Sequence, residues 1–107
     1  MKLLLAIVNK DDANYVNSGL SKAGFIATKI SSTGGFLLSG NTTFLIGVDD
    51  GAVEKVFEII ARYSKKRTVH IPADPLYSHA HITAMPTEVT VGGATIFVLN
   101  VERFEHI

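Results

Sequence analysis

Residues 3–8 read L-L-L-A-I-V, and the fold is built around this run. Six consecutive apolar residues between Lys2 and Asn9 are typical of a strand in the middle of a sheet, because such a strand is buried on both faces. A secretory signal peptide is a poorer interpretation, since charged residues at 10–12 follow at once and no small-residue cleavage site is present. We therefore predict a central strand over residues 2–9.

The composition is that of one packed globular domain over residues 1–107. Of these residues, 47% are apolar and 19% are charged, which suits a single core and not a disordered chain. Ten basic and ten acidic residues cancel, which argues against a general binder of nucleic acid or of membrane surfaces. Cysteine is absent, so disulfides and thiolate chemistry are excluded, and a cytoplasmic location fits.

The other elements follow from apolar spacing and from turn residues. In chain order we expect a helix from Asp11-Asp12 to Gly24, a strand at 25–32, a short loop at 33–40 and a strand at 42–48. A second helix then begins at Asp49-Asp50 and is closed by the basic run 65–67. A short edge strand at 67–72 opens a long loop at 68–88, and one long last strand follows at 88–101 with Gly92-Gly93 inside it. Glycine pairs of this kind indicate a bulge or a close approach of the backbone.

This order, β-α-β-β-α-β, predicts an α+β protein with the ferredoxin-like fold. Two right-handed crossovers place both helices on one face of a four-stranded antiparallel sheet. However, the strands at 3–8, 44–48 and 96–99 are apolar on both faces, and two helices can cover only one. We therefore expect another copy of the chain to bury the second face.

Five collinear segments resemble the PII-like cyclic di-AMP receptor proteins. They are A-T-K at 27–29, T-G-G-F-L at 33–37, G-N-T-T-F-L at 40–45, G-V at 47–48 and V-G-G-A-T-I-F-V at 91–98. The resemblance implies a PII-like protomer, a homotrimer, and sites for cyclic di-AMP in the clefts between subunits. It also implies that the short loop lies over the dinucleotide.

The resemblance also implies which residues contact the ligand. These residues are Thr28, Gly34, Gly35, Phe36, Leu37, Asn41, Gly47, Gly92 and Phe97. Their chemistry suits the task, because a phenyl ring stacks on a base, glycine N–H groups can face a phosphate, and hydroxyl and amide groups hydrogen-bond. Each of them also has an ordinary explanation in a turn or a strand.

The chain departs from the family pattern where the family carries basic residues. Ile26 and Leu38 stand at such positions, and His106 stands where the family has a glutamine near the ligand. Strand alternation puts Ile26, Thr28 and Ile30 on one uncharged face. Two functions are therefore open. One is a cyclic di-AMP receptor that signals to a partner protein by loop rearrangement; the other is a trimer that has lost this ligand and binds another nucleotide or acts as a protein-interaction module.

Metal binding and catalysis have little support in the sequence. His70, His79 and His81 lie close together in the chain, but a zinc site needs further ligands and Asp74 is the only nearby carboxylate. No motif that joins a nucleophile to a base is present. We expect no metal, no other cofactor and no enzymatic activity. The expected partners are copies of the chain, a cyclic dinucleotide and an unidentified downstream protein, without nucleic acid polymers or membrane insertion.

Overall fold

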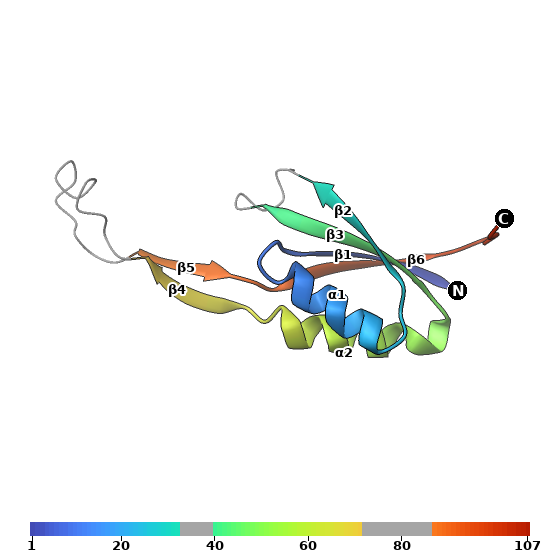
Figure 1. Ribbon diagram of the computed structural model, residues 1–107, viewed down its shortest axis with the longest axis horizontal. Helices are drawn as coiled ribbons and strands as arrows, with labels where there is room; N and C mark the ends of the chain where they lie inside the picture. Colours follow the sequence, from blue (N-terminus) through green and yellow to red (C-terminus); the bar gives the residue numbers. More distant parts are fainter. Residues whose placement is uncertain (33–39, 72–86) are drawn as a thin grey trace.

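The computed structural model describes residues 1–32, 40–71 and 87–107. Its elements are β1 (Lys2–Asn9), α1 (Ala13–Lys22), β2 (Ala27–Ser32), β3 (Asn41–Val48), the 3-10 helix η1 (Asp50–Ala52), α2 (Val53–Tyr63), β4 (Arg67–Ile71), β5 (Thr87–Val91) and β6 (Ala94–Asn100). Strands β2, β3, β1 and β6 form one antiparallel sheet in this order. Figure 1 shows α1 and α2 side by side on one face of it. The arrangement is consistent with the predicted ferredoxin-like fold.

Strand β1 occupies the middle of the sheet, as its apolar run predicts. It pairs with β3 from Lys2↔Val48 to Asn9↔Asn41, and with β6 on its other side. Its alternate side chains Leu4, Ala6 and Val8 are fully buried against the helices. The intervening side chains face the other way and are only half-buried.

The core lies between this inner face of the sheet and the two helices. The apolar side chains that fill it are Leu4, Ala6, Val8, Ala13, Val16, Leu20, Phe44, Ile46, Val48, Val56, Ile59 and Ile60. The helices approach closely at Gly19, where a Cβ atom would lie 2.5 Å from Cε2 of Tyr63. Glycine lowers the intrinsic helical propensity of α1. Its presence at position 19 is explained by the close packing of the two helices, which leaves no room for a side chain.

Asp12 joins α1 to the start of β4. It occupies the N-cap position of α1, but its side chain makes no cap hydrogen bond. Instead its Oδ1 accepts a hydrogen bond from Nη2 of Arg67 at 2.9 Å, and its Oδ2 accepts one from Nη1 at 3.4 Å. The hydrogen bond to Asp12 raises the pKa of Arg67 above its usual value. The basic run 65–67 thus follows the end of α2, and Arg67 forms an ion pair with Asp12.

The last strand differs from the prediction, because Gly92 and Gly93 divide it in two. Both glycines have positive φ angles, +87° and +81°. A Cβ atom at Gly92 would lie 2.4 Å from the carbonyl oxygen of Lys65, and the N–H of Gly93 donates to the carbonyl of Ser64. The expected close approach of the backbone is confirmed, but β5 pairs with β4 in a separate sheet while β6 joins β1. The segment expected as a long loop therefore begins and ends as strand.

Replacement of Asp12 by Asn should lower the free energy of unfolding by about 1–3 kcal/mol, because the Arg67 guanidinium loses its charged acceptor. Urea denaturation at neutral pH measures this difference. Asp11→Asn is the matched control, since that exposed side chain should contribute less than about 0.5 kcal/mol. Equal losses in the two variants would contradict a stabilising ion pair at Asp12.

Candidate functional site

The face of the sheet turned away from the helices is uncharged and largely apolar. Its side chains lie in rows across the strands, as the strand register shows. One row is Thr28, Leu45, Leu5 and Phe97; the next is Gly47, Leu3 and Leu99; a third is Ile30, Thr43, Ile7 and Thr95. Phe97, Leu99 and Ile30 are 50%, 43% and 40% exposed. A contiguous exposed apolar surface of this kind is typical of an interaction site.

The residues predicted to bind ligand lie at two opposite edges of this face. Thr28 and Gly47 are neighbours on the β2–β3 side, whereas Phe97 is on β6. Three strand spacings separate Thr28 from Phe97, which places them about 14 Å apart in one chain. Gly92 precedes β6 on the same side as Phe97. One chain therefore brings Thr28 and Gly47 together, and keeps Phe97 and Gly92 apart from them.

Part of the predicted site lies outside the residues that the structure describes, and part lies on β2. Gly34, Gly35, Phe36 and Leu37 lie outside the described residues, as does Leu38. On β2, Thr28 and Ile30 share the outer face as predicted, and Lys29 faces the opposite way, across from Phe44. The outer face of the described strands thus carries no cation that could pair with a phosphate.

Asn41 is a buried amide with an unused acceptor. The residue is 7% exposed, and its Oδ1 has no hydrogen-bond partner in the part of the chain that the structure describes. Its cross-strand neighbour Asn9 uses its own Oδ1 to accept from the backbone N–H of Asp11 at 2.8 Å. An unpaired buried acceptor costs about 1–3 kcal/mol, so a donor from a ligand would be favoured at Asn41.

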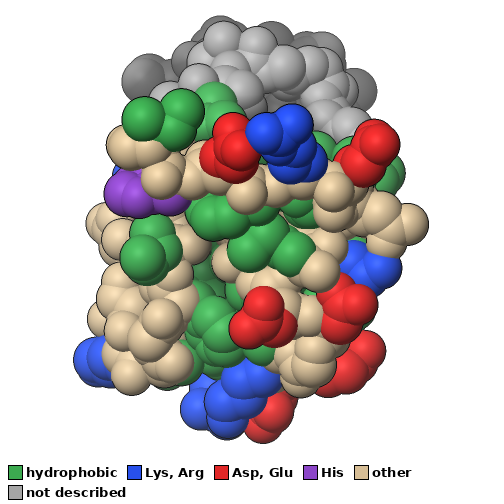
Figure 2. All heavy atoms as spheres, turned by 90° about the vertical axis from the view of Figure 1, so that its right-hand side faces the viewer, with side chains coloured by type: hydrophobic (Ala, Val, Ile, Leu, Met, Phe, Trp, Pro, Cys, Tyr) green, Lys and Arg blue, Asp and Glu red, His purple; other side chains and the backbone are tan. Residues whose placement is uncertain are grey.

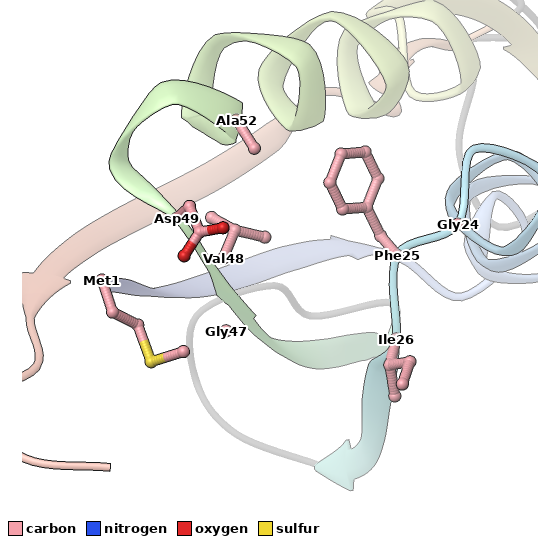
Figure 3. Close-up of a pocket in the computed structure, with 8 residues that line it drawn as sticks. All are labelled: Met1, Gly24, Phe25, Ile26, Gly47, Val48, Asp49 and Ala52. Atoms are coloured by element: carbon pink, nitrogen blue, oxygen red, sulfur yellow. The ribbon is translucent and has the colours of Figure 1, made fainter.

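A cavity of about 270 Å³ opens beside Met1, at the end of the sheet where β1 begins and β3 ends. It is lined by Met1, Gly24, Phe25, Ile26, Gly47, Val48, Asp49 and Ala52. In Figure 3 the ring of Phe25 points toward Ala52, and Ile26 points the opposite way. Ile26 is 86% exposed. Figure 2 shows this end of the molecule, where hydrophobic side chains lie between charged ones.

Electrostatically, this cavity is poorly suited to a phosphate. Asp49 is the charged side chain among its lining residues. The neighbouring Asp50 is already paired: the amino group of Met1 lies 3.0 Å from its Oδ1 and lowers the pKa of that carboxyl by hydrogen bonding. From the sequence, Asp49 was expected only to begin a helix, and Phe25 was not singled out. The position of both beside glycines at strand ends, Gly24-Phe25 and Gly47-Val48-Asp49, is the signal that could have found them.

The two glycines predicted to admit a ligand differ in their surroundings. A Cβ atom at Gly47 would meet nothing within 4 Å, so this position is open to an approaching group. At Gly92 the space is already taken, because a Cβ atom would lie 2.4 Å from the carbonyl oxygen of Lys65 and 2.8 Å from Nη1 of Arg67. The fold alone therefore explains the glycine at 92, and it does not explain the one at 47.

The described residues form neither a cluster of metal ligands nor a membrane-spanning helix. The described segments contain no group of three or more His, Asp or Glu side chains placed to hold a metal ion. His79 and His81 lie outside the described residues. None of the described helices has the length and apolarity needed to cross a bilayer.

Comparison with known proteins agrees with the resemblance over the full chain. The sequence model of a family described as cyclic-di-AMP receptor matches residues 1–107. A solved crystal structure is also similar: a functionally unknown protein from Pediococcus pentosaceus ATCC 25745. It is 43% identical in sequence, with a TM-score of 0.77, and the match covers 99% of this chain and 96% of that one.

Alanine substitutions at Gly47 and Gly92 should show which of the two glycines the fold requires. Gly47→Ala should leave the free energy of unfolding within about 0.5 kcal/mol of the parent protein, because the new methyl group enters open space. Gly92→Ala should lower it by about 2 kcal/mol or more, because the methyl group meets backbone at a positive φ. Thermal and urea denaturation test both variants. A loss at Gly47 as large as that at Gly92 would contradict this difference.

Proposed function

We propose, from the premise that this chain belongs to the cyclic-di-AMP receptor family, that it is a cytoplasmic, non-catalytic signalling receptor. It assembles as a homotrimer and binds cyclic di-AMP in the clefts between subunits. Ligand binding rearranges the loops at 33–40 and 68–88 and so changes the surface that a downstream protein meets. Such a relay works only if the ligand binds one loop arrangement better than the other.

The distribution of the site residues over two sheet edges carries this proposal. Thr28 and Gly47 belong to the β2–β3 edge and Phe97 to the β6 edge, about 14 Å away in the same chain. A small ligand that needs both groups finds them together where the β2 edge of one copy meets the β6 edge of the next. The repeated meeting of two different edges is a heterologous contact, and it closes into a ring of three when each copy is rotated by a third of a turn from the last.

The outer face of the sheet supplies a reason for the ring to be stable. Leu3, Leu5 and Leu45 are half-buried, and Phe97 and Leu99 are exposed, on a face without charge. Burial of apolar surface contributes about 25 cal/mol per Å². Three copies that turn this face inward would remove it from water, which two helices on the opposite face cannot do.

Neutral groups must bind the ligand's phosphates in this proposal. The exposed Thr28 hydroxyl can donate to a phosphate oxygen, and the backbone beside Gly47 is open to close approach. The Oδ1 of Asn41, which has no hydrogen-bond partner among the described residues, suits the exocyclic amine of an adenine. No residue of the described outer face offers a charge-assisted bond.

The absence of that charge supports a second candidate function. Ile26 is 86% exposed beside a cavity whose charged side chain is the acid Asp49. A site with this lining favours an uncharged or cationic group over a dianion. The alternative is therefore a trimer of the same architecture that has lost cyclic di-AMP and binds another nucleotide or a protein.

The trimer can be tested on the exposed aromatic of the outer face. Light scattering after size-exclusion chromatography should give three times the protomer mass for the parent protein. Phe97→Glu should shift it toward the monomer, because a buried unpaired charge is strongly unfavourable. Tyr15→Glu is the control, since Tyr15 is 66% exposed on α1. A monomeric parent protein, or a trimer that survives Phe97→Glu, would contradict the proposed face.

Calorimetric titration with cyclic di-AMP tests the ligand. Ile26→Arg should bind it roughly ten- to a hundredfold more tightly than the parent protein, because one charge-assisted hydrogen bond contributes about 1.5–3 kcal/mol. Tyr15→Arg adds the same charge far from the cleft and should change nothing. Binding by Ile26→Arg but not by the parent protein would favour the alternative function. Weaker binding by Ile26→Arg would place the phosphates elsewhere.

A further inference from the structure

A cavity of about 260 Å³ lies between α1 and α2. Every residue that lines it belongs to one of the two helices or to Ala23, which ends α1. Figure 1 shows both helices on one face of the sheet, and the outer face is the other one. In the proposed ring the outer face turns inward, so this cavity stays accessible to another protein.

The floor of the cavity is apolar. It is formed by Ile59, which is 6% exposed, and by Tyr63, which is half-buried. Both side chains lie against Gly19 of α1, since a Cβ atom there would be 3.1 Å from Cγ2 of Ile59 and 2.5 Å from Cε2 of Tyr63. Position 19 therefore has no side chain of its own to fill the space between the helices.

The rim of the cavity is basic. Its charged lining residues are Lys22 on α1 and Lys55 and Arg62 on α2, and all three are exposed. Lys22 and Lys55 have no ion-pair partner among the described residues. Arg62 lies 3.6 Å from Glu58, but both side chains are 60% exposed, and a pair of this kind contributes little. Even with Glu58 included, the rim keeps an excess of positive charge.

Helix stability explains one of these lysines and not the other. Lys22 is in the last turn of α1, where a cation interacts favourably with the helix dipole. Lys55 is in the first turn of α2, which begins at Val53, and there the dipole disfavours a cation. A partner with negative charge would offset this cost at Lys55.

We propose that this helix groove, formed by Lys22, Lys55, Ile59, Arg62 and Tyr63, binds an acidic segment of a partner protein. Two carboxylates of the segment pair with the rim, and an apolar side chain between them covers the floor. The inference goes beyond the proposed function, because it requires no bound cyclic di-AMP and applies to both candidate functions.

The spacing of the cations favours a protein segment over a single phosphate group. Lys55 and Arg62 are seven residues apart on one helix, so about 10 Å separates them along its axis. Carboxylates three residues apart in an extended segment have about the same separation. One phosphate cannot bridge this distance, whereas such a segment places a side chain above Ile59 and Tyr63.

Two other cavities of the described chain are poorer sites for an acidic partner. The one beside Met1 has Asp49 as its charged lining residue, which would repel a carboxylate. The other, of about 390 Å³, is lined by Lys65 and Lys66 but also by Ala94 and Ile96 of β6. Because the proposed ring brings the β6 edge against a neighbouring copy, charge complementarity and access together select the helix groove.

Fluorescence anisotropy with a labelled peptide tests the groove. The probe is G-S-D-S-L-D-S-G, in which two aspartates three residues apart flank a leucine. We expect the parent protein to bind it. Replacement of both aspartates by asparagine, or of the leucine by serine, should raise the dissociation constant about tenfold or more, because each removes one half of the match.

Charge reversal in the protein locates the binding site. Lys22→Glu combined with Lys55→Glu should raise the dissociation constant of the probe about tenfold or more. Lys10→Glu is the control, since Lys10 is exposed and precedes α1, at the other end of that helix. A version of the probe with lysine in place of both aspartates should bind the double variant and not the parent protein.

Four results would overturn the inference. These are no binding of the probe by the parent protein, equal binding of the leucine and serine peptides, binding that survives in the double variant, and displacement of the probe by inorganic phosphate at an equal concentration. The first would leave the groove without its ligand, the next two would mean diffuse attraction, and the last an anion site only. The mass of the assembly and the titration with cyclic di-AMP test the proposed function separately.

Discussion

Pairing of β1 with a strand on each side is the constraint on which the rest of the structure depends. Because β3 and β6 hydrogen-bond to its two edges, β1 has no free edge and its side chains face only the two sides of the sheet. Leu4, Ala6 and Val8 give α1 and α2 a surface to pack on. The alternate residues are just as apolar, and they leave the second face without a cover from the same chain. The core and the candidate interface thus arise from one run of six residues.

Much of this fold could be predicted from local sequence. Apolar spacing found β1, β2, β3 and both helices, and Gly24 ends α1 with φ +87° as a helix-terminating glycine should. The failures involve partners far apart in the chain. The sequence places the start of α1 at Asp11-Asp12, and Asp12 is its N-cap residue, but no local pattern shows that the side chain pairs with a residue fifty-five positions away. At Gly92-Gly93 the sequence indicates a break without showing that the two halves join different sheets.

The site was less predictable than the fold. Thr28, Gly47 and Asn41 were named from the resemblance, and the register puts them on the outer face of the same two strands. Their ordinary residue types carry no local signal of function. Sequence also could not separate Gly47, which lies in open space, from Gly92, which packs against Lys65, because that difference depends on tertiary contacts. The roles of Phe25 and Asp49 as cavity walls have the same origin.

The sheet formed by β4 and β5 has a consequence for local stability. Within the described chain these strands hydrogen-bond to each other and not to the four-stranded sheet. A pair of strands alone is marginally stable in water, so its amide protons should exchange with solvent through local opening, well before those of β1. The contacts at its base, from Arg67 to Asp12 and from Gly93 to Ser64, tie it to the helices. The protein thus contains a segment that can change its order while the core stays folded.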